Sequence, residues 1–93
     1  MKKNKLGKFL KDKRVKADLT QWDVANKLGY SSAQFISNFE RGLCSPPLNQ
    51  LKNIVDLYDL NPDELVDLMM EERQRLIEKS IYGKVRKSRK YSS

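Results

Sequence analysis

Histidine is absent from the 93-residue sequence, and Cys44 is its one cysteine. Without histidine, the chain cannot build a Ser–His–Asp triad or a histidine acid–base pair. One cysteine and no histidine also exclude a Cys/His zinc site and a disulfide within one chain, and this cysteine usage is typical of a reducing compartment. We therefore expect a protein that is not an enzyme and that holds no metal or cofactor.

Long apolar runs are also missing, so we expect no segment that spans a membrane. The basic N-terminus is not followed by the continuous apolar stretch of a signal peptide, and we expect a cytoplasmic protein. Three prolines and four glycines are too few for a low-complexity chain. With 39% hydrophobic and 33% charged residues, the chain is expected to form one small domain.

The net charge of +7 is spread unevenly along the chain. Residues 1–16 carry eight Lys or Arg and one Asp, and residues 84–93 carry five Lys or Arg and no acid. Between them, residues 56–72 carry seven Asp or Glu and no basic residue. Basic ends indicate a polyanionic partner, and the acidic belt indicates that the surface is not uniformly attractive to one.

Apolar residues recur with helical spacing through most of the chain, and no segment alternates with the period of a strand. The spacing predicts five helices. The apolar faces of the first four are Leu6, Phe9 and Leu10; Val24, Ala25 and Leu28; Ile36, Phe39 and Leu43; and Leu48, Leu51, Ile54, Val55 and Tyr58. A fifth helix is predicted at 62–82, because Asn61 and Pro62 favour a helix start and Gly83 favours a stop.

Residues 20–42 fit two short helices joined by a tight turn. Thr20 can cap the first of these helices and Gly29 ends it, and Ser31 or Ser32 can cap the second. Two helices joined in this way suit a helix-turn-helix, whose second helix enters the major groove of DNA.

A helical wheel separates the core side of this second helix from a polar side. With Ile36 at 0° and about 100° per residue, Phe39 and Leu43 fall within about 60° of it. The opposite side and its flank display polar side chains, namely Gln34, Ser37, Asn38 and Arg41. Amide and guanidinium groups can pair with the edges of adenine and guanine. Because any surface helix is polar opposite its core face, an ordinary solvated face is an equal alternative on the wheel alone.

The same segment resembles the phage-repressor and Cro type of helix-turn-helix domain, the Xre family, over residues 6–58. The matching residues are Thr20-Gln21, Val24-Ala25, Leu28-Gly29, Ser31, Ile36-Ser37, Glu40 and Gly42, with a proline soon after. The resemblance implies a compact all-α, lambda-repressor-like fold with a helix-turn-helix at 20–42 and a long C-terminal helix. We therefore expect a DNA-binding domain at 1–83 and a basic, disordered tail at 84–93.

The resemblance also implies roles for single residues in and around a reading helix near 32–42. The residues expected to read bases or to flank them are Ala33, Gln34, Ser37 and Asn38. The residues expected at DNA phosphates are Thr20, Gln21, Ser32 and Arg41. The family acid at the end of the reading helix pairs with an arginine late in the first helix. The resemblance therefore implies an ion pair between Arg14 and Glu40, with two solvated charges as the alternative.

One departure from the family pattern lies between Gly29 and Ile36, where the chain is one residue longer than usual. The additional residue falls within 30–35. It lengthens either the turn or the start of the reading helix.

A helix-turn-helix of this size reads only a few base pairs, so specificity is expected from two copies on a palindrome. The fifth helix, about 30 Å long, exceeds what a four-helix core needs. We expect a homodimer through this helix, with the candidate contacts Leu65, Met69, Leu76, Ile77 and Ile81. The alternative is that these residues fold back onto the same chain.

For several other residues the sequence allows two roles. Lys2, Lys3 and Lys5 can form an arm that reaches phosphates or a solvated start, and the basic tail can add a nonspecific DNA contact or serve solubility. Trp22 can pack on the sugar–phosphate backbone or against the first helix, and Cys44 is most simply an incidental thiol.

The function that we expect is that of a sequence-specific regulator of transcription, a repressor that occupies a site in double-stranded DNA. The alternative is an antitoxin-like or other protein-interaction module, in which the fifth helix or the tail binds an unknown protein and DNA binding is secondary. RNA binding is disfavoured, because the A-form major groove does not admit a helix and the sequence shows no aromatic stacking platform.

Overall fold

The computed structural model describes residues 4–83, which form five α-helices and one short 3-10 helix and contain no strand. In chain order the elements are α1 (Lys5–Lys16), α2 (Gln21–Leu28), α3 (Gln34–Glu40), η1 (Leu48–Gln50), α4 (Leu51–Tyr58) and α5 (Pro62–Tyr82). The predicted all-α class is confirmed. The tail at 84–93 and the lysines at positions 2 and 3 lie outside the described residues.

Local capping explains where α2 and α5 begin and end. The Thr20 side chain accepts from the Asp23 N–H while the Asp23 carboxylate accepts from the Thr20 N–H, which satisfies two orphan donors at the start of α2. Asn61 caps α5, and Gly29 and Gly83 end α2 and α5 in the left-handed conformation. The predicted bounds of the fifth helix are therefore confirmed.

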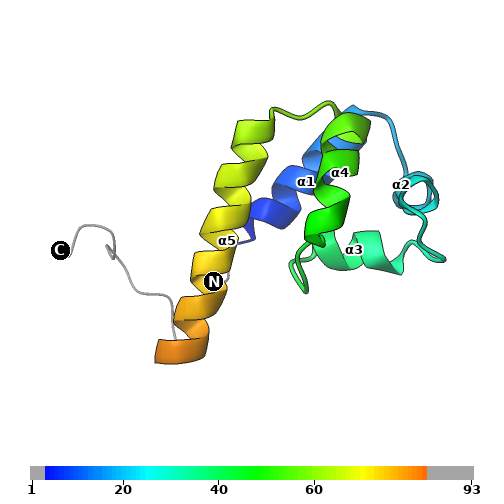
Figure 1. Ribbon diagram of the computed structural model, residues 1–93. Helices are drawn as coiled ribbons and strands as arrows, with labels where there is room; N and C mark the ends of the chain where they lie inside the picture. The colour runs from blue at the N-terminus through cyan, green and yellow to red at the C-terminus, as the bar shows by residue number, and fades with distance from the viewer. Residues whose placement is uncertain (1–3, 84–93) are drawn as a thin grey trace.

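Helices α1 to α4 form a compact body around one core, with α1 packed against α3 and α5 (Figure 1). Helix α2 is seen nearly end-on in Figure 1 while α3 runs across the view, so the two helices cross steeply. The buried apolar residues are Leu6, Leu10, Val24, Ala25, Leu28, Ile36, Phe39, Ile54, Tyr58, Leu60 and Leu65. Within residues 20–42, the buried apolar residues are those that the helical spacing indicated, and Glu40 is buried with them.

Two residues that were expected on apolar faces are exposed instead. Leu43 is 62% exposed, because α3 ends at Glu40 and Gly42 turns the chain away in the left-handed conformation. Leu48 is 80% exposed, because it opens the 3-10 turn η1 instead of lying on α4. The predicted reading helix near 32–42 is thus shorter in the structure, spanning Gln34–Glu40.

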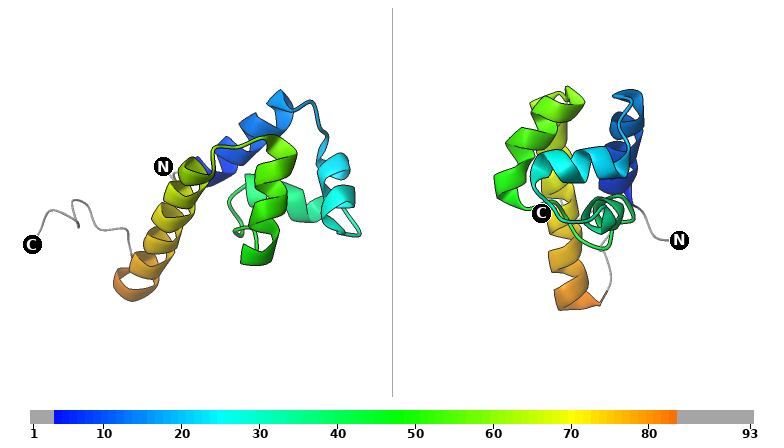
Figure 2. Two further views of the ribbon diagram at one scale, coloured as in Figure 1. Left: turned by 45° about the horizontal axis from the view of Figure 1, so that its top comes forward. Right: turned by 90° about the vertical axis from the view of Figure 1, so that its right-hand side faces the viewer.

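Helix α5 divides into a half that packs on the body and a half that extends past it (Figures 1 and 2). Leu65 is buried in the core, and Met69 packs against the core. Leu65 is therefore a correction to the predicted dimer contacts, since its side chain is enclosed in the core, whereas Met69 is only half-buried. Leu76, Ile77 and Ile81 are exposed on the half that extends away.

Candidate nucleic-acid interface

The outer side of α3 carries a connected row of polar side chains. Gln34 Nε2 donates to Asn38 Oδ1 at 2.9 Å, and Arg41 Nη2 donates to the same oxygen at 3.1 Å. Gln34 and Arg41 are exposed and Asn38 is half-buried, while Ile36 and Phe39 on the other side of the helix are buried. We call Gln34, Asn38 and Arg41 the polar row.

The hydrogen bonds within the polar row decide what it offers to a ligand. A carbonyl oxygen has two lone pairs, and both of those on Asn38 Oδ1 accept from neighbours in the row. The groups that Asn38 can still offer to a ligand are therefore its Nδ2 donors, in addition to the further N–H groups of Arg41. A row rich in donors and free of acids suits acceptor groups such as guanine N7 and O6 or phosphate oxygens.

Behind this row, a buried ion pair joins α1 to the end of α3. Arg14 Nε donates to Glu40 Oε2 at 2.6 Å and Arg14 Nη2 donates to Oε1 at 3.2 Å, and both side chains are at least nine-tenths buried. Arg14 Nη1 also donates to the carbonyl of Leu19 at 2.7 Å. The hydrogen bond to Glu40 raises the pKa of Arg14, so the guanidinium stays charged. The structure contains the predicted Arg14–Glu40 ion pair.

Gln21 takes part in the same network, which sequence reasoning did not foresee. Its Nε2 donates to Glu40 Oε1 at 3.0 Å, so one amide donor points to α3 and not to solvent. The network thus fixes α1, the start of α2 and the end of α3 relative to one another. A phosphate contact by Gln21 would have to use its second amide N–H or its main-chain N–H.

Asn4 and Gly7 form a close junction between α1 and α3 that sequence reasoning also missed. Asn4 Oδ1 accepts from the Gly7 N–H and caps α1, while Asn4 Nδ2 donates to the main-chain carbonyl of Glu40 at 2.8 Å. A Cβ on Gly7 would overlap that same carbonyl oxygen. The sequence carried both signals, because asparagine favours helix starts and a glycine inside a helix marks a close backbone approach.

The turn between α2 and α3 spans residues 30–33. The Tyr30 N–H donates to the Ala25 carbonyl and the Gly29 N–H to the Asn26 carbonyl, which closes the end of α2 as a Schellman motif. The Tyr30 ring stacks on Phe35, with centroids 4.6 Å apart. Helix α3 begins only two residues before Ile36, which favours a longer turn as the place of the additional residue.

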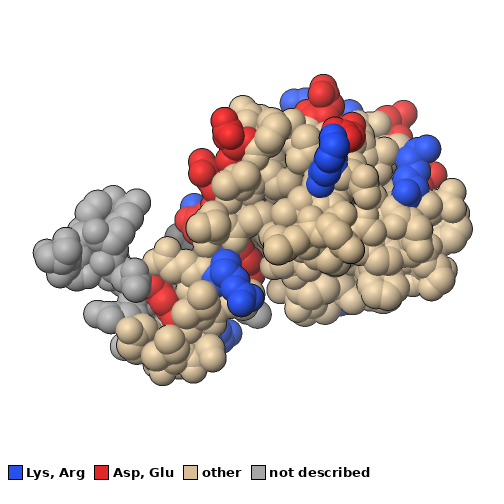
Figure 3. Space-filling model, in the orientation of Figure 1, with Lys and Arg blue, Asp and Glu red and all other residues tan. Residues whose placement is uncertain are grey.

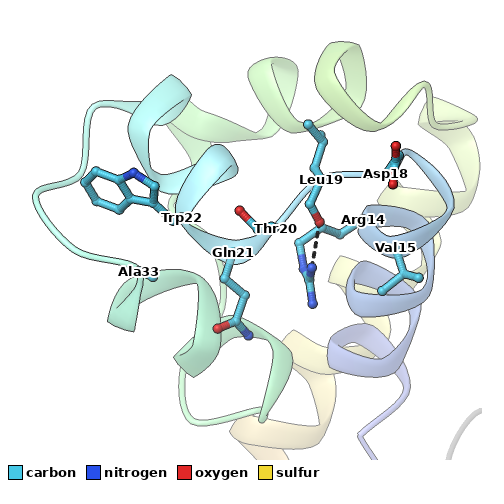
Figure 4. A pocket seen from close by; sticks show the side chains of 8 residues that line it. All are labelled: Arg14, Val15, Asp18, Leu19, Thr20, Gln21, Trp22 and Ala33. Carbon is cyan, nitrogen blue, oxygen red and sulfur yellow. Dashed lines mark hydrogen bonds between the residues drawn. The ribbon is translucent and has the colours of Figure 1, made fainter.

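An open hollow of about 520 Å³ lies where the end of α1 meets the first residues of α2 and α3 (Figure 4). Thr20, Gln21 and Ala33, three of the residues predicted to contact DNA, line it together with Trp22. Trp22 is 52% exposed, so its indole remains available at the rim. Ser32 lies in the turn before α3, where its Oγ accepts from the Gln34 N–H at 3.0 Å.

Charges are segregated on the surface. In Figure 3 most acidic side chains on this face lie over the upper half of α5 and along the top of the molecule, whereas Figure 1 places α3 at the lower edge of the body. Lys5, which was considered for an arm to phosphates, pairs with Glu71 of α5 at 3.3 Å at the surface. The polar row is thereby separated from the acidic belt.

Within residues 4–83, no group of three metal-ligating side chains comes together, and Cys44 is exposed. Over the same residues, no helix combines the length and the apolar character needed to cross a bilayer.

Comparison with known proteins relates the described helices to helix-turn-helix proteins. Residues 5–69 match the family model described as "Helix-turn-helix domain". The HTH-type transcriptional regulator ImmR of Bacillus subtilis (strain 168) is 38% identical over 61 residues, which cover 66% of this chain and 47% of ImmR. The chain therefore spans about half the length of this relative.

A solved structure shares the fold. A chain of the complex between the SinR protein and the SinI protein aligns with a TM-score of 0.56, covering 90% of this chain and 85% of that one. At 24% sequence identity, this similarity concerns the fold alone.

Proposed function

The chain belongs to the helix-turn-helix family, and from this premise we propose that it is a sequence-specific regulator of transcription that acts as a repressor. It would work in the cytoplasm, as a homodimer on double-stranded DNA at the nucleoid. One observation carries the proposal: α3 presents an exposed polar row, free of acids, on a helix fixed from behind by the buried Arg14–Glu40 pair.

In this proposal the residues divide by the part of DNA that they contact. Base edges are read by the side of α3 that holds Gln34 and Asn38, flanked by Ala33 and Ser37. Phosphates are held by the start of α2 and by the ends of α3, through Thr20, Gln21, Ser32 and Arg41. Buried contacts at Glu40 keep the reading helix rigid, which reduces the ordering cost of binding.

The experiment that tests the proposal is selection from random duplex DNA with the full chain at about 150 mM salt. A palindrome with half-sites about 10 base pairs apart, or a multiple of that, is the expected product. Enrichment of no sequence, with binding that only follows the salt concentration, would contradict the proposal and would favour a protein-interaction module.

A pair of variants then tests which residues read bases. Asn38→Ala should cost about 1–3 kcal/mol on the selected site and relax the preference at one position. Gln21→Ala should weaken binding to all sequences about equally, because a phosphate contact carries no sequence information. Thermal unfolding of both variants controls for the loss of the Gln21–Glu40 hydrogen bond. If Gln34→Ala and Asn38→Ala both leave the preferred site unchanged, the assignment of the reading face is wrong.

A further inference from the structure

Helix α5 carries a second apolar face, apart from the one that packs on the core. It consists of Val66, Met70, Ile77 and Ile81, which are 56%, 67%, 46% and 66% exposed. On a helical wheel these four residues fall within about 60° of one another, whereas Leu65 lies about 100° away on the core side. We call these four residues the α5 stripe.

An exposed apolar stripe along most of a 21-residue helix is costly to leave in water. The half of α5 that extends past the body holds Ile77 and Ile81, and Figures 1 and 2 show no other described helix beside it.

The spacing of the stripe is symmetric about a point between Arg73 and Gln74. Val66 precedes this midpoint by as many residues as Ile81 follows it, and Met70 and Ile77 are related in the same way. A two-fold interface uses the same patch on both subunits, so the patch must be complementary to itself after rotation. Two copies of α5 placed antiparallel about this midpoint bring every apolar residue of the stripe opposite another one.

Charge favours the same arrangement. The first half of α5 carries Asp63, Glu64, Asp67, Glu71 and Glu72, whereas the second half carries Arg73, Arg75 and Lys79 with only Glu78 as an acid. Antiparallel pairing places the acidic half of one copy beside the basic half of the other. Parallel pairing would set acid against acid and base against base along the whole contact.

We propose that a second copy of this chain docks on the α5 stripe, antiparallel, about a two-fold axis between Arg73 and Gln74. This proposal deepens the proposed function. It rests on that function only in assuming that two copies of the chain act together. Its tests measure association without DNA, so its failure and a failure of DNA selection are seen in separate experiments.

Arg73 lies on the same side of α5 as the α5 stripe, close to the proposed two-fold axis. Its aliphatic stem can extend the apolar surface while its guanidinium reaches water at the edge. A charged group at the centre of a helix pair fixes register but weakens association. Arg73→Leu is therefore expected to tighten the dimer.

The first test is sedimentation of the full chain over a concentration series. The chain should dimerise, and Ile77→Lys should weaken the dimer by at least about tenfold by burying an unpaired charge. Leu48→Lys is the matched control, because Leu48 is more exposed than Ile77 yet lies in η1, and it should leave the dimer unchanged. Circular dichroism checks that both variants stay folded. A monomer at every concentration, or equal effects of the two variants, would overturn the proposal.

The second test distinguishes the two helix directions with a short bis-maleimide reagent on a Cys44→Ser background. Antiparallel pairing predicts cross-links when Val66→Cys and Ile81→Cys chains are mixed, and few when either is alone. Efficient cross-linking of the Val66→Cys chain to itself would indicate parallel helices and would overturn the proposal. The Arg73→Leu variant adds a gain of function, and a dimer weaker than that of the parent chain would count against the axis.

Discussion

At the scale of single residues, Glu40 joins three elements through two different groups. Its carboxylate accepts from Arg14 of α1 and from Gln21 of α2, while its main-chain carbonyl accepts from Asn4. Since Glu40 is also the last residue of α3, these bonds fix one end of the proposed reading helix. The position of the polar row therefore depends on contacts made on the opposite side of the helix.

Removing one partner of the buried Arg14–Glu40 pair should lower the free energy of unfolding far more than removing one partner of a surface ion pair. Glu40→Ala would leave the Arg14 guanidinium buried without its counter-charge, and we expect a loss of about 3–5 kcal/mol in the free energy of unfolding. Glu71→Ala is the control, because its pair with Lys5 is more than half exposed and should be worth less than about 1 kcal/mol. Urea unfolding measures both, and equal losses would show that the buried pair contributes no more than a surface pair.

Gly7 offers a test of the α1–α3 junction in which the sign of the effect is informative. Alanine in place of a glycine inside a helix ordinarily stabilises by about 0.5–1 kcal/mol. Here the new Cβ would meet the Glu40 carbonyl, which is main chain and cannot move aside cheaply. We therefore expect Gly7→Ala to destabilise, by about 1–3 kcal/mol as for other overpacked sites.

Gly29→Ala is the matched control for Gly7→Ala. A Cβ at Gly29 would meet no atom within 4 Å, so only its left-handed conformation, with φ of 84°, opposes the change. That strain is worth about 1–2 kcal/mol. A Gly7→Ala protein more stable than the parent in urea unfolding would show that α1 and α3 are not in such close contact.

At the scale of the elements, both ends of α5 were predictable from local signals, whereas apolar spacing alone extended α3 too far at its end and α4 too far at its start. Both ends of α5 followed from Asn61-Pro62 and from Gly83, because caps act within one turn of the chain. The end of α3 was misjudged, since Leu43 has helical spacing from Ile36 but follows Gly42, where the chain turns away. The exposed state of Leu48 likewise depends on the 3-10 turn, for which the apolar spacing gave no sign.

The functional site shows the same division. The polar row followed from a helical wheel, which is local information. The Arg14–Glu40 pair spans 26 positions, and only the resemblance to a family brought these two residues together. The roles of Gln21 and Asn4 at Glu40 became visible only when three helices were placed side by side.

The capping box of α2 makes a prediction about pH. The Thr20 N–H donates to the Asp23 carboxylate and lowers the pKa of that group below its ordinary value. A depressed pKa in the folded state means that the ionised carboxylate stabilises the fold above the unfolded-state pKa, about 3.9. This stabilisation should be lost as the pH falls through the lower folded-state pKa.

Thermal unfolding of the parent chain and of Asp23→Asn at neutral and acidic pH measures this effect. The parent should be the more stable at neutral pH, and the difference should shrink on acidification. Asp12→Asn serves as a control at a surface pair with Lys8. A difference between the parent and Asp23→Asn that is independent of pH would contradict the role given to the ionised carboxylate.

At the scale of the whole molecule, the uneven charge along the sequence places most of the negative charge away from α3. The acidic belt runs from the end of α4 along the packed half of α5, and α3 lies on another side of the body. A polyanion that approaches α3 therefore avoids the region of greatest negative charge. The same belt provides the acidic half of the proposed α5 pairing, so one charge pattern serves both proposed interfaces.

The separation of the acidic belt from α3 predicts how the affinity for DNA depends on salt concentration. Each phosphate neutralised by a basic side chain releases counterions, so the logarithm of the binding constant falls with the logarithm of the salt concentration by about 0.9 per contact. Arg41→Gln should reduce that slope by about one if Arg41 holds a phosphate. Asp67→Asn changes the net charge by one unit in the opposite direction, in α5 and away from α3, and should leave the slope unaltered. Titrations of the selected site at several salt concentrations measure both. An unchanged slope for Arg41→Gln together with a relaxed base preference would assign Arg41 to base reading, and a changed slope for Asp67→Asn would place the belt next to DNA.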